Sequence, residues 1–212
     1  KASVFFTDRE YSDRAREALA GCDAKPKVID VDDPMFDGGE LIGDMTFDML
    51  LASGDADFDW ELPQKEWQSI ALNYTSGTTG MPKAVVFNNG RWWKAYGAFG
   101  YSAVRLTAED RMYCTLPFYH ATGMVVCWAS VIWGGGSLVL ARKFSASRFW
   151  DDIRKYDCTS FGYVGELCRY LNEQPAQPND LDNKVRVIVG NGLRPGIWVP
   201  FKERFGIERI VE

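Results

Sequence analysis

Residues 69–87 read SIALNYTSGTTGMPKAVVF, in which a loop rich in glycine and hydroxyl side chains lies between two short apolar segments. The apolar segments 69–74 and 84–87 predict β-strands. Residues 75–83 between them contain four Ser or Thr hydroxyls, two glycines and Lys83. Glycines let the backbone turn its N–H groups toward an anion, hydroxyls add donors, and the lysine adds a positive charge. The stretch therefore predicts a loop that binds a polyphosphate.

Two other interpretations of this loop fit less well. Solvated Ser/Thr/Gly turns are common on composition alone. The nucleotide loop of P-loop ATPases requires the pattern G-x-x-x-x-G-K-[ST]. Here only two residues separate Gly77 from Gly80, and Lys83 follows a proline. Ala84 stands where that pattern needs Ser or Thr, so the pattern fails.

Outward from the loop, strand-like apolar runs alternate with helix-like amphipathic runs. Strands are predicted at 3–7, 27–31, 69–74, 84–87, 112–116, 137–141, 159–164, 185–190 and 209–211. Helices are predicted at 11–20, 47–52, 91–105, 124–133, 147–156, 166–172 and 195–205. This alternation predicts an α/β fold with mostly parallel sheets flanked by helices. The acidic segment 32–59 is expected to be a surface connection.

A second polar string, LPFYHATG at residues 116–123, follows a predicted strand and contains the single histidine of the chain, His120. A lone histidine is more often structural than functional, so its position relative to other motifs must decide. The apolar run 121–134 that begins inside this string has 14 residues. Because a membrane-spanning helix needs roughly 20 residues, a buried core helix is expected there.

A third string, VRVIVGNGLRP at residues 185–195, is a predicted strand that ends in a glycine-rich turn. A dinucleotide fingerprint would require G-x-G-x-x-G. Here Gly196 comes one place too late after Gly190 and Gly192, and it follows a proline. A plain strand-to-helix turn also explains these glycines.

Together the three strings resemble the AMP-forming adenylating enzymes, which include acyl-CoA synthetases, luciferases and the adenylation domains of peptide synthetases. Residues 74–84 match the signature Y-T-S-G-T-T-G-x-P-K-G except at Ala84. Residues 116–123 are similar to the motif L-P-x-[FY]-H-x-x-G. Residues 189–195, VGNGLRP, resemble the I-G-N-G-L-R-P segment of very-long-chain acyl-CoA synthetases and fatty-acid transport proteins.

The resemblance implies roles for individual residues. The loop is expected to hold the phosphates of ATP through Thr75, Ser76, Gly77, Thr78, Thr79, Gly80 and Lys83. The adenine and acyl pocket is expected to involve His120, Gly190, Asn191 and Gly192. Lys83 and His120 are the catalytic candidates, although His120 is not expected to be a general base. No residue is assigned to a metal ion.

The resemblance also implies an activity and a position within a larger enzyme. ATP, Mg²⁺ and CoA are expected to serve the conversion of a carboxylic acid, expected to be a fatty acid, to acyl-AMP and then acyl-CoA. Residues 1–212 are expected to form an internal fragment of the large N-terminal AMP-binding domain, with a subdomain change near 84–110. The C-terminal domain and a Y-G-x-T-E motif just past Glu212 are absent, so the fragment alone is expected to be inactive. Glu212 itself is not expected to be a magnesium ligand.

The resemblance changes along the chain. Residues 1–83, with VIDVDDP at 28–34 and DWELP at 59–63, resemble short- or medium-chain acid:CoA ligases, whereas residues 84–212 resemble the very-long-chain group. The length of the acyl chain therefore stays open. Two alternatives also stay open: an adenylating enzyme that loads a carrier protein, and a non-catalytic nucleotide-binding module of the same fold.

The bulk composition fits this class. The formal net charge of −5 argues against a nucleic-acid binder. Five cysteines at wide spacings, without a C-x-x-C pair, are typical of reduced, buried thiols in a cytosolic protein. With one histidine and no paired cysteines, a structural zinc site is not expected. We expect a cytoplasmic protein without a transmembrane segment, and peripheral contact with a membrane stays open.

Overall fold

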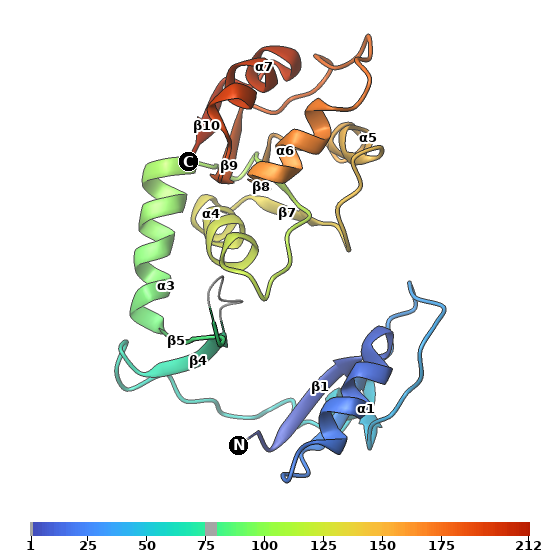
Figure 1. Cartoon of the computed structure of the whole chain (residues 1–212). Helices are drawn as coiled ribbons and strands as arrows, with labels where there is room; N and C mark the ends of the chain where they lie inside the picture. The colour runs from blue at the N-terminus through green and yellow to red at the C-terminus, as the bar shows by residue number, and fades with distance from the viewer. Residues whose placement is uncertain (1, 75–79) are drawn as a thin grey trace. The chain divides into compact units, whose positions relative to one another are not determined.

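The computed structural model describes residues 2–74 and 80–212, which belong to two compact units, Lys1–Leu62 and Pro63–Glu212 (Figure 1). The predicted subdomain change near 84–110 stays a prediction. Helices and strands of the described residues occur close to the predicted positions, with boundaries that differ by up to a few residues.

The first unit contains a three-stranded parallel sheet in the order β1-β2-β3. Its elements are β1 (Val4–Asp8), η1 (Arg9–Tyr11), α1 (Ser12–Ala20), β2 (Lys27–Val31), β3 (Met45–Thr46) and α2 (Phe47–Ala52). Asp8 ends β1 and caps η1, since its carboxylate accepts a hydrogen bond from the Glu10 amide. Segment 32–59, predicted as a surface connection, also contributes strand β3 and helix α2.

The second unit contains a five-stranded parallel sheet, which confirms the predicted fold class. Its strands are β6 (Arg111–Cys114), β7 (Ser137–Leu140), β8 (Ser160–Val164), β9 (Val187–Asn191) and β10 (Arg209–Val211), in the order β10-β9-β8-β6-β7. All four strand pairings are parallel. Helices α5 (Phe149–Lys155), α6 (Gly165–Asn172) and α7 (Pro195–Phe205) lie in the connections between the strands.

Side chains of the central strands alternate between two buried faces. Tyr113 and Phe161 pack against Phe149 of α5, with ring centroids 5.1 and 5.0 Å apart respectively. On the other face, Gly162 lies so close to Cys127 that a Cβ atom would come within 2.2 Å of its sulfur. Helices cover both faces of the sheet. The mainly apolar sequences of the strands fit a parallel sheet that is buried on both faces.

The two strands predicted at 69–74 and 84–87 pair antiparallel, which the sequence did not predict. Strand β4 (Ser69–Tyr74) pairs with β5 (Ala84–Asn88), and Tyr74 lies opposite Ala84. Asn88 then caps α3 (Asn89–Ala95), because its side-chain oxygen accepts a hydrogen bond of 2.9 Å from the Arg91 amide.

Two predicted helices contain wide turns of π-helix. The first continues from α3 into η2 (Tyr96–Val104), and Arg105 ends it with a φ of 57°. The second consists of η3 (Thr122–Trp128) and α4 (Ala129–Gly134). The expectation of a buried core helix at 121–134 was wrong in part, since Trp128, Ile132 and Trp133 are exposed. One side of this helix packs on the sheet, and Trp133 packs against η2, where its ring centroid lies 5.6 Å from that of Tyr101.

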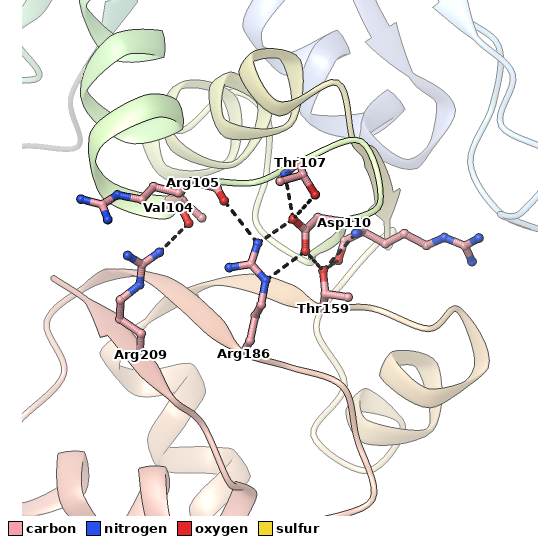
Figure 2. Close-up of polar contacts among 8 residues, drawn as sticks. Val104, Arg105, Thr107, Asp110, Thr159, Arg186 and Arg209 are labelled. Atoms are coloured by element: carbon pink, nitrogen blue, oxygen red, sulfur yellow. Dashed lines mark hydrogen bonds and ion pairs between the residues drawn. The ribbon is translucent and has the colours of Figure 1, made fainter.

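A polar network joins the amino-terminal ends of strands in the large sheet (Figure 2). The buried Asp110 accepts hydrogen bonds from the Arg186 guanidinium at 2.6 and 3.2 Å and from the Thr159 hydroxyl at 2.7 Å. The Thr107 amide donates a further bond of 2.7 Å. Arg186 also donates to the Arg105 carbonyl. The network ties β6 and β9 to the end of η2, away from the carboxyl ends of the strands.

Four of the five cysteines are buried, free thiols, as predicted. Burial raises the pKa of Cys158 and of Cys168 to about 12, so both thiols stay protonated near neutral pH. Cys22 is exposed, which corrects the prediction for that residue; it follows Gly21 at the end of α1, where the chain leaves the core. Within residues 2–74 and 80–212, no helix is long and apolar enough to cross a bilayer.

Candidate functional site

The strand order of the large sheet reverses between β6 and β8. The chain passes from β6 to β7 on one side and then to β8, β9 and β10 on the other. In open α/β sheets, ligands bind outside the carboxyl ends of strands where the strand order reverses in this way. His120 follows β6, and the turn with Asn191 and Gly192 ends β9, so tertiary structure brings both predicted motifs to this edge.

The loop that carries His120 is held by backbone bonds. The His120 amide donates to the Pro117 carbonyl at 3.0 Å, and the Met124 amide donates to the His120 carbonyl at 3.1 Å. A Cβ atom at Gly123 would lie 2.6 Å from the Pro117 carbonyl oxygen, so this position needs glycine. The last residue of the LPFYHATG string is thereby explained by a close backbone approach.

The imidazole of His120 is oriented by a neighbouring amide. The Thr122 N–H donates to His120 Nδ1 at 3.3 Å. Because Nδ1 then acts as an acceptor, a neutral His120 carries its proton on Nε2. The ring can offer Nε2–H as a donor to a bound molecule, which agrees with an orienting role better than with a general base.

His120 lines a small, mainly apolar cavity of about 180 Å³. Its walls come from the β4–β5 hairpin, from α3 and from the start of η3: Ile70, Ala71, Asn73, Phe87, Trp92, His120, Ala121, Met124 and Val125. The hairpin that bears the predicted phosphate loop therefore packs directly beside the histidine motif. Sequence analysis did not identify Asn73 or Trp92 as lining residues. Asn73 directly precedes the signature, which was the signal available for it.

Gly190 and Gly192 have separate structural reasons. A Cβ atom at Gly190 would lie 2.0 Å from the Tyr163 carbonyl oxygen, because β8 and β9 pair closely there. Gly192 has a φ of 77°, a conformation that favours glycine. Asn191 is exposed between them. The turn is thus fixed by the fold and presents its middle residue to solvent.

Glu212 is a residue of this edge that the sequence analysis did not assign to the site. Its carboxylate follows β10 and accepts hydrogen bonds from the amides of Gly192 and Leu193 and from the Tyr163 hydroxyl. Burial and the contact with Glu212 raise the pKa of Tyr163, so the phenol remains a donor. The glycine turn is therefore linked to both β8 and β10.

The predicted phosphate loop is only partly described. Thr75, Ser76, Gly77, Thr78 and Thr79 lie outside the described residues. Gly80 has a φ of 146°, a conformation that favours glycine, and a Cβ atom there would meet no atom of the described residues within 4 Å beyond its chain neighbours. Lys83 directly precedes β5 and lies next to this glycine segment. These two residues suit a loop that surrounds an anion.

Magnesium would need oxygen ligands from this chain, from ATP or from both. Among residues 2–74 and 80–212, no group of three or more His, Cys, Asp or Glu side chains could hold a metal ion. Mg²⁺ is usually held by one or two carboxylates together with substrate phosphates.

Comparisons with known proteins show the family and the fold of this chain. A family model described as AMP-binding enzyme matches residues 1–212. Over 139 residues the chain is 50% identical to a medium/long-chain-fatty-acid–CoA ligase of Mycobacterium tuberculosis, covering 66% of this chain and 23% of the relative. It is 49% identical to long-chain fatty acid transport protein 1 of Homo sapiens, covering 66% of this chain and 21% of that protein. The chain spans less than a quarter of the length of these relatives.

Solved structures share the fold at lower sequence identity. An anthranilate CoA ligase in complex with anthranoyl-AMP superposes with a TM-score of 0.80 and 17% identity, over 99% of this chain and 40% of that chain. An O-succinylbenzoate-CoA synthetase from Bacillus subtilis in complex with ATP and magnesium gives a TM-score of 0.71 and 21% identity, over 97% of this chain and 38% of that chain. At these identities the likeness establishes the fold.

Proposed function

Because this chain belongs to the AMP-binding enzyme family, we propose that it forms the ATP- and acid-binding part of an acyl-CoA synthetase. The observation that carries the proposal is the cavity shared by His120 and the β4–β5 hairpin. Strands β4 and β5, which flank the predicted phosphate loop in the sequence, line this mainly apolar pocket, and this supports the proposal. A polyphosphate and a hydrophobic acid would meet at such a place.

The proposed reaction has two steps. A carboxylate oxygen of the acid attacks the α-phosphorus of ATP, and the bond from that phosphorus to the bridging oxygen breaks to release pyrophosphate. The thiol sulfur of CoA then attacks the acyl carbon, AMP leaves, and the thiol proton passes to solvent. Both steps depend mainly on alignment and charge neutralisation.

Residues of this chain are proposed to supply this alignment. Lys83 and the Gly80 backbone would neutralise and hold the phosphates, together with Thr75, Ser76, Gly77, Thr78 and Thr79. The Nε2–H of His120 would donate to an oxygen of the bound acid or adenylate, with Nδ1 held by the Thr122 amide. Asn191 and the two glycines beside it would border the adenine. Magnesium, when bound with ATP, supplies further positive charge at the phosphates.

A fatty acid is the proposed substrate class. Several lining residues of the His120 cavity are apolar, including Ile70, Phe87 and Met124. Such walls favour a hydrocarbon chain by the hydrophobic effect. The relatives described as fatty-acid–CoA ligase and fatty acid transport proteins support this class. The cavity does not define the length of the acyl chain.

We further propose that these 212 residues act as part of a larger protein, as their relatives' greater length suggests. Alone, the chain is expected to give little or no acyl-CoA. Robust acyl-CoA formation by the isolated chain would contradict this part of the proposal.

The test is acid-dependent exchange of pyrophosphate into ATP by the complete protein that contains this chain, with acids from short to very long. Lys83→Ala should lower exchange about 100-fold or more, because it removes a charge from the phosphate site. Lys65→Ala is the matched control on the same unit, where the side chain is exposed. Unchanged exchange in the folded Lys83 variant would remove Lys83 from the site. No exchange by the parent with any acid would support a non-catalytic module.

A further inference from the structure

Glu212 connects the carboxyl-terminal ends of three neighbouring strands of the large sheet, β8, β9 and β10. Its Oε1 atom accepts hydrogen bonds from the Gly192 amide and, at 3.2 Å, from the Leu193 amide. Its Oε2 atom accepts from the Tyr163 hydroxyl. One carboxylate at the end of β10 therefore contacts β8 and the turn after β9.

The turn needs such an acceptor because of its backbone conformation. Gly192 has a φ of 77°, and a residue in this region next to an ordinary one turns successive N–H groups toward one point. Two converging N–H groups form a small anion-binding concavity. Here the Glu212 carboxylate occupies it, and bonds from N–H groups to a charged acceptor are stronger than those between neutral groups.

Tyr163 fixes the carboxylate in turn. Its ring is fully buried in β8, and its hydroxyl also lies 3.2 Å from the Val211 carbonyl oxygen. Gly165 lies directly against the turn, since a Cβ atom there would lie 1.7 Å from the Gly192 carbonyl oxygen. The buried Tyr163 side chain thus holds one carboxylate oxygen of Glu212, and the other oxygen holds the turn.

From these contacts we infer that Glu212 is a positioning residue for adenine: it keeps the Asn191–Leu193 turn in one conformation and so raises affinity for the adenosine part of the nucleotide. This inference rests on the proposed function. The phosphate loop belongs to a different element, the β4–β5 hairpin. Loss of Glu212 should therefore weaken binding of adenosine-containing ligands and spare binding of phosphates alone.

The experiment compares three ligands, ATP, AMP and inorganic tripolyphosphate, by titration calorimetry with the complete protein that contains this chain. Glu212→Ala should raise the dissociation constants of ATP and AMP about tenfold, because the competent turn is populated less. Binding of tripolyphosphate should change less than about twofold. Glu212→Gln keeps an oxygen for the two amides and should stay within about threefold of the parent for all ligands.

A second measurement needs no ligand. Amide hydrogen exchange of a peptide that covers residues 190–198 should become about tenfold faster in Glu212→Ala. Tyr163→Phe should cause a smaller increase, because it removes only the support of the carboxylate. Glu208→Ala is the control, since Glu208 is an exposed glutamate just before β10.

The outcomes separate this inference from the proposed function. Unchanged exchange at 190–198 in Glu212→Ala overturns the positioning role. Equal loss of affinity for ATP and tripolyphosphate also overturns it, since it would indicate general destabilisation. A parent chain that binds tripolyphosphate but neither ATP nor AMP contradicts the proposed function, while the exchange measurement still decides the role of Glu212.

Discussion

Replacing Asp110 with asparagine removes the carboxylate at the centre of the network that joins the strands at the amino edge of the sheet (Figure 2). Burial alone raises the pKa of this carboxyl. Hydrogen bonds from Arg186, Thr159 and the Thr107 amide outweigh burial and lower the pKa from 3.8 to about 2. The folded state therefore stabilises the charged form of Asp110 relative to the unfolded chain.

The pKa shift sets the size and pH range of the effect. A shift of nearly two units corresponds to about 2.5 kcal/mol. The Arg186 side chain is 36% exposed, which weakens the ion pair by solvent screening. We therefore expect Asp110→Asn to lower the free energy of unfolding by about 2 kcal/mol at pH 7. For a chain of this size that corresponds to a fall in Tm of about 4–8 °C.

The sign of the pH dependence follows from the direction of the shift. Because the folded-state pKa lies below the unfolded value, the stabilisation is complete above about pH 5. It disappears as the pH falls from about 4 to about 2, where Asp110 becomes protonated in the folded protein too. The difference between parent and variant should shrink over this same range.

The assay is urea unfolding followed by circular dichroism at pH 7, 5, 4 and 3. Asp151→Asn is the control, because Asp151 also pairs with an arginine, Arg154, but its side chain is 75% exposed. Its effect should stay below about 0.5 kcal/mol. An Asp110→Asn effect that is equally small at pH 7, or that does not change between pH 7 and pH 3, would show that the network does not stabilise the charged carboxylate.

Three further outcomes can be checked. Gly190→Ala should destabilise the folded chain by about 2 kcal/mol or more in urea unfolding, since the new methyl group would overlap the Tyr163 carbonyl; an unchanged midpoint would contradict this close approach. Gly123→Ala should displace the loop that carries His120 and lower acid-dependent pyrophosphate exchange of the complete protein about tenfold or more; wild-type exchange would show that the loop tolerates a side chain. Native protein should react rapidly with a thiol reagent at Cys22 alone, and all five cysteines should react in denaturant; rapid native reaction of a second thiol would contradict the burial of the others.

Local patterns in the sequence were sufficient for the elements and for the main motifs. Helix α7 and strands β2, β4 and β10 have the predicted bounds, because their apolar periodicity and flanking residues act over short range. The predicted parallel sheet also follows from the alternation of strands and helices. The family resemblance rested on short strings whose residue order alone is specific.

The sequence failed where a conformation depends on contacts between distant residues. The antiparallel pairing of β4 with β5 depends on which residues of the two strands face each other. The π-helical turns of η2 and η3 depend on how these helices pack against the rest of the chain. Exposure of Trp133 at 121–134 likewise depends on which side of the helix meets the sheet.

The candidate site divides in the same way. The sequence alone predicted a phosphate loop, a role for His120 and the glycine turn, because glycine, hydroxyl and charged side chains in a fixed order indicate their chemistry locally. Only the tertiary structure placed Asn73 and Trp92 beside His120, and Glu212 on the turn at Gly192. These contacts join residues that are far apart in the chain, and the strand order of the folded sheet brings them together.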